Sequence, residues 1–140
     1  MLTMKVYCYM VNDLMKYRLN KSRDDLKSSE ILFNQKLFAQ SLNRSYYCIF
    51  HAVKALLALD CFDSRKHSGI IAFFNENYIK KNKIDIELSK ILMDAQKIRT
   101  KSDYDDFYVA TEKTALIQYE NAKKFLIDIE NFLINSGQDI

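Results

Sequence analysis

Residues that could do chemistry gather first on one face of a predicted helix. Asn43, Tyr47 and His51 follow one another at intervals of four, so a helix places them in a row, with Arg44 beside them. A tyrosine ring in such a row could stack on a nucleobase, and an imidazole could contact a phosphate or a hydroxyl. The alternative, which we favour for His51, is a ring that packs between two helices and has one satisfied hydrogen bond.

A second basic group stands where a polar connector gives way to a helical pattern. Arg65, Lys66 and His67 lie at the start of this helix, where free backbone N–H groups and the helix dipole attract anions. They form a candidate phosphate site, because three cations at a helix start oppose the dipole unless an anion is bound. The alternative is capping alone, in which Ser64 or Ser68 satisfies the helix start and His67 packs against a neighbouring helix.

A third candidate is Arg99, which is followed by Asp103 and Tyr104. A guanidinium can bind phosphate oxygens through several N–H donors. The alternative is structural: Arg99 forms an ion pair with Asp103 that ties a helix end to a loop, and Tyr104 covers this pair. The candidate residues for binding a nucleotide or RNA are Arg44, Tyr47, His51, Lys66, His67, Arg99, Asp103 and Tyr104, and those for catalysis are Arg99, His51 and His67.

Helices must position these residues. The chain has 140 residues, 49% of them hydrophobic and 28% charged, which is the composition of a single soluble globular domain. It has no proline and only two glycines, so long stretches contain nothing that interrupts a helix. The expected fold class is all-α, an up-down bundle of four long helices plus a short inserted helix. Apolar residues at spacings of three and four predict these helices over residues 12–33, 38–59, 68–78, 85–99 and 108–135.

Two patterns place side chains in the interior. Tyr46 and Phe50 belong to an apolar stripe of the second helix that starts at Ala39, and we assign both rings to the core. Ser22 and Ser29, on the corresponding stripe of the first helix, are small enough to let another helix approach closely. The first two helices should therefore form an antiparallel hairpin.

Local chemistry predicts where the elements end. Asn34 tolerates the left-handed conformation that terminates helices, and Asp85 is a good N-cap for the fourth helix. A break is expected at residues 102–106. Residues 1–11 form an N-terminal segment of uncertain structure with a weak strand-like alternation, and residues 136–140 are expected to fray.

Charge and cysteine content narrow the setting. The formal charge of +3 is uneven, because Lys and Arg outnumber acids in residues 1–104 and acids outnumber them in residues 105–140. A basic and an acidic face could result, although solvated helix surfaces explain any single lysine more simply. Cys8, Cys48 and Cys61 show no C-x-x-C spacing, which favours reduced thiols in the cytoplasm.

Other classes of protein are disfavoured. No apolar run approaches the roughly 20 residues of a membrane span, and no signal-peptide cleavage pattern follows the N-terminal segment, so we expect no membrane association. Metal sites in helical bundles use Glu-x-x-His pairs. Neither His51 nor His67 has such a glutamate, so we expect no metal and no cofactor.

Taken together, three motifs resemble the HEPN domain (higher eukaryotes and prokaryotes nucleotide-binding), specifically its small stand-alone prokaryotic members. The resemblance runs from about residue 17 to residue 133, with a single domain over residues 1–140. Its motifs are Arg44-x-Tyr46-Tyr47-x-x-Phe50-His51-Ala52, the turn His67-Ser68-Gly69, and Arg99 followed by Asp103-Tyr104.

This resemblance implies a homodimer that holds a nucleotide or RNA. It also implies a frequent partner, a minimal nucleotidyltransferase encoded beside it in a toxin–antitoxin module. Tyr104 would then be a ligand contact, or a hydroxyl acceptor for nucleotide transfer from that partner.

The ribonuclease-active branches of the family imply a further signature, an Arg followed four to six residues later by His. Two subunits bring these residues together and cut RNA without a metal. Here the corresponding positions after Arg99 are Asp103, Tyr104 and Asp105, so the signature is broken and an enzymatic function is left open. One alternative is an endoribonuclease toxin in which His51 or His67 replaces the missing His, and another is a purely structural, partner-binding dimer.

Overall fold

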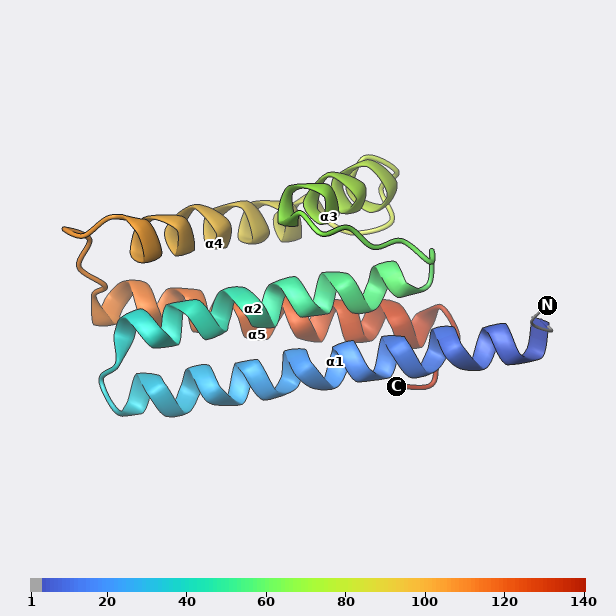
Figure 1. The fold of residues 1–140 in the computed structure, drawn as a ribbon, viewed down its shortest axis with the longest axis horizontal. Coiled ribbons are helices and arrows are strands. Elements are labelled where there is room, and N and C mark those ends of the chain that lie inside the picture. The colour runs from blue at the N-terminus through green and yellow to red at the C-terminus, as the bar shows by residue number, and fades with distance from the viewer. Residues whose placement is uncertain (1–3) are drawn as a thin grey trace.

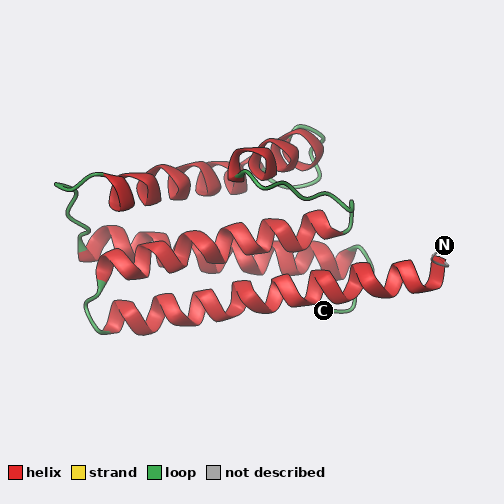
Figure 2. Ribbon diagram, in the orientation of Figure 1, coloured by secondary structure: helices red, strands yellow, loops and turns green. Residues whose placement is uncertain are grey.

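The computed structural model describes the backbone of residues 4–140 and the side chains from Met10 onward. This part of the chain is helical and contains no strand, which confirms the all-α class (Figure 2). Its backbone over residues 4–11 is helical, in place of the weak strand-like pattern, while residues 1–3 lie outside the described residues. The elements are α1 (Met4–Asn34), α2 (Phe38–Ala58), α3 (His67–Phe74), the π-helix η1 (Asn75–Ile79), α4 (Ile86–Tyr104) and α5 (Glu112–Asn135).

Helix α2 is the centre of this arrangement. It runs antiparallel to α1, lies beside α5, and is covered along its remaining side by α4, with α3 near its C-terminal half (Figure 1). Its apolar stripe is accordingly buried: Tyr46 is 1% exposed and Phe50 is 5% exposed, as predicted. Ala39 was assigned to the same stripe and is exposed, because the first turn of α2 borders an open cleft.

Serines join α1 to α2. Ser22 and Ser29 are fully buried, and the Ser22 hydroxyl donates to the Cys48 carbonyl at 2.6 Å. The Ser29 hydroxyl lies 2.7 Å from that of Ser45 and 3.0 Å from the carbonyl of Ser41. The small serine side chains thus let the two backbones approach, as the sequence suggested, and their hydroxyl groups also satisfy each other's hydrogen bonds.

Several element ends differ from expectation. The left-handed residue after α1 is Lys36 (φ 62°) rather than Asn34, because the Leu37 N–H closes the helix on the Leu32 carbonyl at 2.9 Å. Asp85 does cap α4, accepting from the Glu87 N–H at 2.8 Å.

The segment between α4 and α5 is also placed differently. Helix α4 continues to Tyr104, so the break expected at residues 102–106 begins only at Asp105, whose carboxylate accepts from the Phe107 N–H. Helix α5 begins at Glu112 rather than near residue 108, because Thr111 caps it by accepting from the Thr114 N–H at 3.1 Å.

The C-terminal residues, for which the sequence suggested fraying, leave α5 through a left-handed Gly137 (φ 86°). Asp139 lies 3.4 Å from Lys16, and Ile140 packs against the core. No helix in residues 4–140 combines the length and apolarity that a membrane span requires.

The buried serines generate a stability prediction. Ser29→Val should lower the free energy of unfolding by about 2 kcal/mol, because it removes a hydroxyl network and crowds a tight helix contact. Ser28→Val, on the neighbouring and more exposed position, makes the same change in helix propensity and should cost well under about 1 kcal/mol. Urea unfolding of both variants measures the difference, and equal losses would contradict the tight packing assigned to Ser29.

Candidate functional site

The candidate site is built around Arg99, where α4 packs against α2. The Arg99 guanidinium carbon lies 5.3 Å from the Tyr46 ring centroid and 5.5 Å from that of Tyr47, within the range of cation–π contacts. Its Nη2 donates to the Tyr47 hydroxyl at 3.2 Å. Its Nε lies 3.0 Å from an Asp103 carboxylate oxygen, so the Arg99–Asp103 ion pair considered from the sequence is present. The Nε–H bond of Arg99 does not point at this Asp103 oxygen, so the buried Nε makes no hydrogen bond.

Tyr104 does not belong to this cluster. Because α4 continues through it, Asp103 lies one turn after Arg99 on the same face and Tyr104 is rotated away. Tyr104 is 75% exposed, so it does not cover the ion pair as the structural alternative required. It makes no hydrogen bond or ring contact with the described residues.

His67 enters the cluster from the first residue of α3. Its Nδ1 lies 2.7 Å from the Tyr46 hydroxyl, and its ring stacks on Phe50 with centroids 4.0 Å apart. The Tyr47 ring meets it edge-on at 6.0 Å. Burial lowers the pKa of His67, and the nearby positive charges of Arg99 and Lys54, with His51, lower it further, so the imidazole is neutral at neutral pH.

His51 joins the Arg99 cluster from α2 and is held in place by Asp25 of α1. Its Nδ1 lies 2.6 Å from one carboxylate oxygen of Asp25, whose other oxygen accepts from Arg44 Nη1 at 3.0 Å. The Arg44 guanidinium also lies 5.0 Å from the Tyr47 ring centroid, and the His51 ring lies 5.7 Å from it. Tyr47 therefore contacts both arginines and both histidines of the site.

Asp25 was missed by the sequence reasoning. It is only 8% exposed, and it follows Ser22 by three residues and precedes Ser29 by four. Those intervals place it beside the buried stripe of α1, which is the signal that could have identified it. A carboxylate in such a position needs a partner, and Arg44 and His51 both have the chemistry to supply one.

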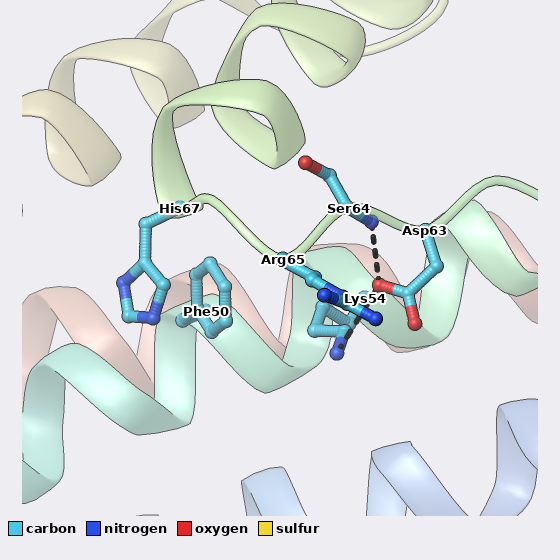
Figure 3. Close-up of a pocket in the computed structure, with 6 residues that line it drawn as sticks. All are labelled: Phe50, Lys54, Asp63, Ser64, Arg65 and His67. Carbon is cyan, nitrogen blue, oxygen red and sulfur yellow. Dashed lines mark hydrogen bonds and ion pairs between the residues drawn. The ribbon is translucent and has the colours of Figure 1, made fainter.

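Two open clefts flank the cluster. One, of about 530 Å³, is lined by Phe50, Lys54, Asp63, Ser64, Arg65 and His67. Figure 3 shows the His67 ring beside Phe50, and the Lys54 and Arg65 side chains border the same cleft. The other, of about 420 Å³, lies on the opposite side of Tyr47. Its lining residues are Leu32, Ala39, Gln40, Asn43, Arg44, Ser102 and Asp103.

The start of α3 departs from the simple anion-site interpretation. The Ser64 hydroxyl accepts from the Lys66 N–H at 3.2 Å, which caps the turn before the helix. A Cβ on Gly69 would lie 2.5 Å from that hydroxyl oxygen, so glycine is needed for this close approach. Lys66 is exposed and lines neither of these clefts, so it stays outside the cluster with Tyr104.

The cluster thus contains six of the eight binding candidates that the sequence singled out. Among the described side chains, no group of three or more His, Cys, Asp or Glu residues is arranged to hold a metal ion. What the arrangement can do chemically is bind an anion with guanidinium groups and exchange protons or hydrogen bonds with it through two imidazoles.

Comparison with known proteins agrees with the helical motifs. The family model of the HEPN domain matches residues 15–133. Two proteins of Methanocaldococcus jannaschii named as candidate toxins are each 31% identical to this chain: MJ0142 over 85% of this chain and 81% of its own length, and MJ0605 over 80% and 83%. A UPF0332 protein of Thermotoga maritima is 28% identical over 86% of this chain and 91% of its own length. This chain belongs to the HEPN domain family.

Proposed function

We propose that this HEPN protein binds single-stranded RNA, or a nucleotide derived from it, at the cluster around Arg99, and that it is the toxin of a toxin–antitoxin module. The observation that carries the proposal is the position of Arg99. Two tyrosine rings and an ion pair with Asp103 hold the side chain in place, and no described group accepts from its Nη1, which is not buried. Such a guanidinium is preorganised for a phosphate.

The carboxylates around the cluster are compatible with an anion site, because each is paired with cations. Asp25 is engaged by Arg44 and His51, and Asp63 lies 3.3 Å from Lys54 and 3.1 Å from Arg18. Arg65 points into the same cleft and has no ion pair with a described residue. The first cleft therefore has two cations, Lys54 and Arg65, against the single carboxylate of Asp63, which favours an anion there.

The two clefts also favour a strand over a mononucleotide. They lie on either side of the Tyr47 cluster, one bordered by Lys54 and Arg65 and the other by Arg44 and Asp103. An RNA strand that crosses Arg99 would place nucleotides in both clefts. The names of the relatives as candidate toxins support an RNA target in the cell, since RNA-binding toxins act on an essential polymer.

A second candidate function, metal-independent RNA cleavage, is favoured by the two histidines. Both rings are anchored through Nδ1, and neither Nε2 is hydrogen-bonded to a described residue or buried without a partner, which leaves both nitrogens for a substrate near Arg99. Imidazoles can transfer the protons of a phosphodiester cleavage while a guanidinium stabilises charge on the phosphate. This chemistry does not require a His four to six residues after Arg99, the signature that is absent from this sequence.

Partners belong to the same proposal. The loop after α4 is unusually apolar and exposed, with Phe107 at 92% and Val109 at 77%, and Tyr104 stands at its start. An accessible hydroxyl next to an apolar loop suits recognition by a partner, such as a minimal nucleotidyltransferase that modifies Tyr104. Leu116, Ile127 and Ile134 are exposed on α5, and their spacings of eleven and seven residues place them on one helix face, which supports a homodimer.

The binding proposal predicts the effect of removing Arg99. Arg99→Ala should weaken binding of a fluorescently labelled ten-nucleotide RNA by about tenfold or more, because a preorganised phosphate contact is lost. Lys97→Ala removes the same charge from an exposed position on the same helix and should change affinity by less than about threefold. Fluorescence anisotropy at fixed salt measures both affinities. Equal losses of affinity would show that Arg99 contributes only its positive charge and not a specific phosphate contact.

The cleavage candidate predicts a separate result. Purified protein should cut a mixed RNA pool in the presence of EDTA, and its expression should arrest growth. Arg99→Ala and His51→Ala should each lower cleavage on the order of 10²-fold and relieve the arrest. If the RNA stays intact and expression is harmless while anisotropy still detects binding, the protein is a binding module; if neither occurs, the structural-dimer alternative remains.

A further inference from the structure

The partner of His51 dictates which of its nitrogens carries a proton. Both oxygens of Asp25 are hydrogen-bond acceptors here, one from Arg44 Nη1 at 3.0 Å and the other facing His51 Nδ1 at 2.6 Å. A carboxylate in this role has nothing to donate, so Nδ1 must hold the hydrogen. The neutral ring then has its lone pair on Nε2, the nitrogen that is open to solvent.

The hydrogen-bond partner of His67 requires the opposite tautomer. Tyr46 is 1% exposed, and burial raises the pKa of its hydroxyl to about 12, against the opposing effect of Arg99. The buried hydroxyl hydrogen needs an acceptor, and the only described group in hydrogen-bonding position is His67 Nδ1, at 2.7 Å. Tyr46 therefore donates to Nδ1, and the neutral ring of His67 carries its own hydrogen on Nε2.

We propose that Asp25 and Tyr46 are positioning residues that hold His51 and His67 in opposite tautomers, so that one ligand meets an Nε2 lone pair from His51 and an Nε2–H from His67. Both rings flank Phe50, with centroids 6.1 Å and 4.0 Å from it, and both contact Tyr47. The centroids of the two imidazoles are therefore no more than about 10 Å apart. Within that limit, one ring accepts a proton from the ligand and the other donates a hydrogen bond to it.

Charged groups around the two rings are compatible with this assignment. His51 faces Asp25 from α1, and Arg44 reaches the same carboxylate from α2. His67 faces Tyr46 and Lys54 from α2 and Arg99 from α4, and these cations oppose its protonation. His67 thus remains a neutral donor, comparable in role to a neutral imidazole that polarises a substrate oxygen.

For RNA, and resting on the function proposed above, the tautomers assign distinct roles. His51 Nε2 takes the proton of a ribose 2′-hydroxyl, and the 2′-oxygen forms a bond to the adjacent phosphorus as the bond from phosphorus to the 5′-oxygen breaks. The leaving 5′-oxygen takes a proton from water, and the His51 imidazolium returns its proton to solvent. His67 Nε2–H and Arg99 donate hydrogen bonds to the non-bridging phosphate oxygens throughout. The products are a 2′,3′-cyclic phosphate and a 5′-hydroxyl.

The tautomers can be measured without any ligand, because His51 and His67 are the only histidines in the chain. Nitrogen-15 NMR of the imidazoles of the full chain, followed through a pH titration, should show the neutral form of His51 with its hydrogen on Nδ1 and the neutral form of His67 with its hydrogen on Nε2. Two rings in the same tautomer would overturn the proposal.

Substitutions test the positioning residues themselves. Asp25→Asn keeps the shape but can donate from its amide, so the signals of His51 should shift toward the Nε2–H tautomer. Tyr46→Phe removes the donor and should release the preference of His67 alone. Asp24→Asn, an exposed neighbour with the same change of charge, should leave both sets of signals unchanged. A spectrum that Asp25→Asn does not alter would remove Asp25 from the assigned role.

Kinetics then separate this inference from the proposed function. If the protein cuts RNA, Asp25→Asn should lower kcat on the order of 10²-fold with little change in KM. The double variant that combines Asp25→Asn with His51→Ala should lose no more activity than His51→Ala alone. Additive losses would contradict the coupling of Asp25 to His51. Opposite tautomers in a protein that neither binds nor cuts RNA would leave the inference intact and refute the function.

Discussion

Burial of the Asp25 carboxylate is the constraint on which the site depends. A charge in the contact between α1 and α2 is costly unless it is paired and hydrogen-bonded, and Asp25 meets this requirement with Arg44 on one oxygen and His51 on the other. Those partners are seven residues apart on α2, two turns along one face. One residue of α1 therefore sets how the polar face of α2 is presented.

A second dependence concerns how α4 is attached. Its buried residues are Leu88, Ile91, Leu92 and Ala95, none of them beyond the middle of the helix. Beyond Ala95 the helix is held to α2 mainly through Arg99 and its contacts with the tyrosine rings. The end of α4 that carries the functional arginine is thus secured by polar and cation–π contacts, which a bound anion would share, and not by deep apolar packing.

The motif that identifies the family serves both the core and the site. Tyr46 is buried against the core and its hydroxyl orients His67; Phe50 is buried and supports the same ring. A substitution at Tyr46 or Phe50 would therefore disturb the core and the position of His67 together. The Arg-to-His signature is different, because Asp103 and Tyr104 occupy its place, one paired with Arg99 and the other turned to solvent.

The sequence by itself determined the local facts: helices instead of strands, the burial of Tyr46 and Phe50, and the close approach at Ser22 and Ser29. It also offered the ion pair of Arg99 with Asp103, four residues later, as one of two alternatives. These follow from helical periodicity, which specifies the face on which a residue lies. Periodicity says nothing of how one helix is rotated and shifted against another. Only the tertiary structure therefore decided that Asp25 meets His51, that Tyr46 meets His67, and that α4 runs on far enough to turn Tyr104 away from Arg99.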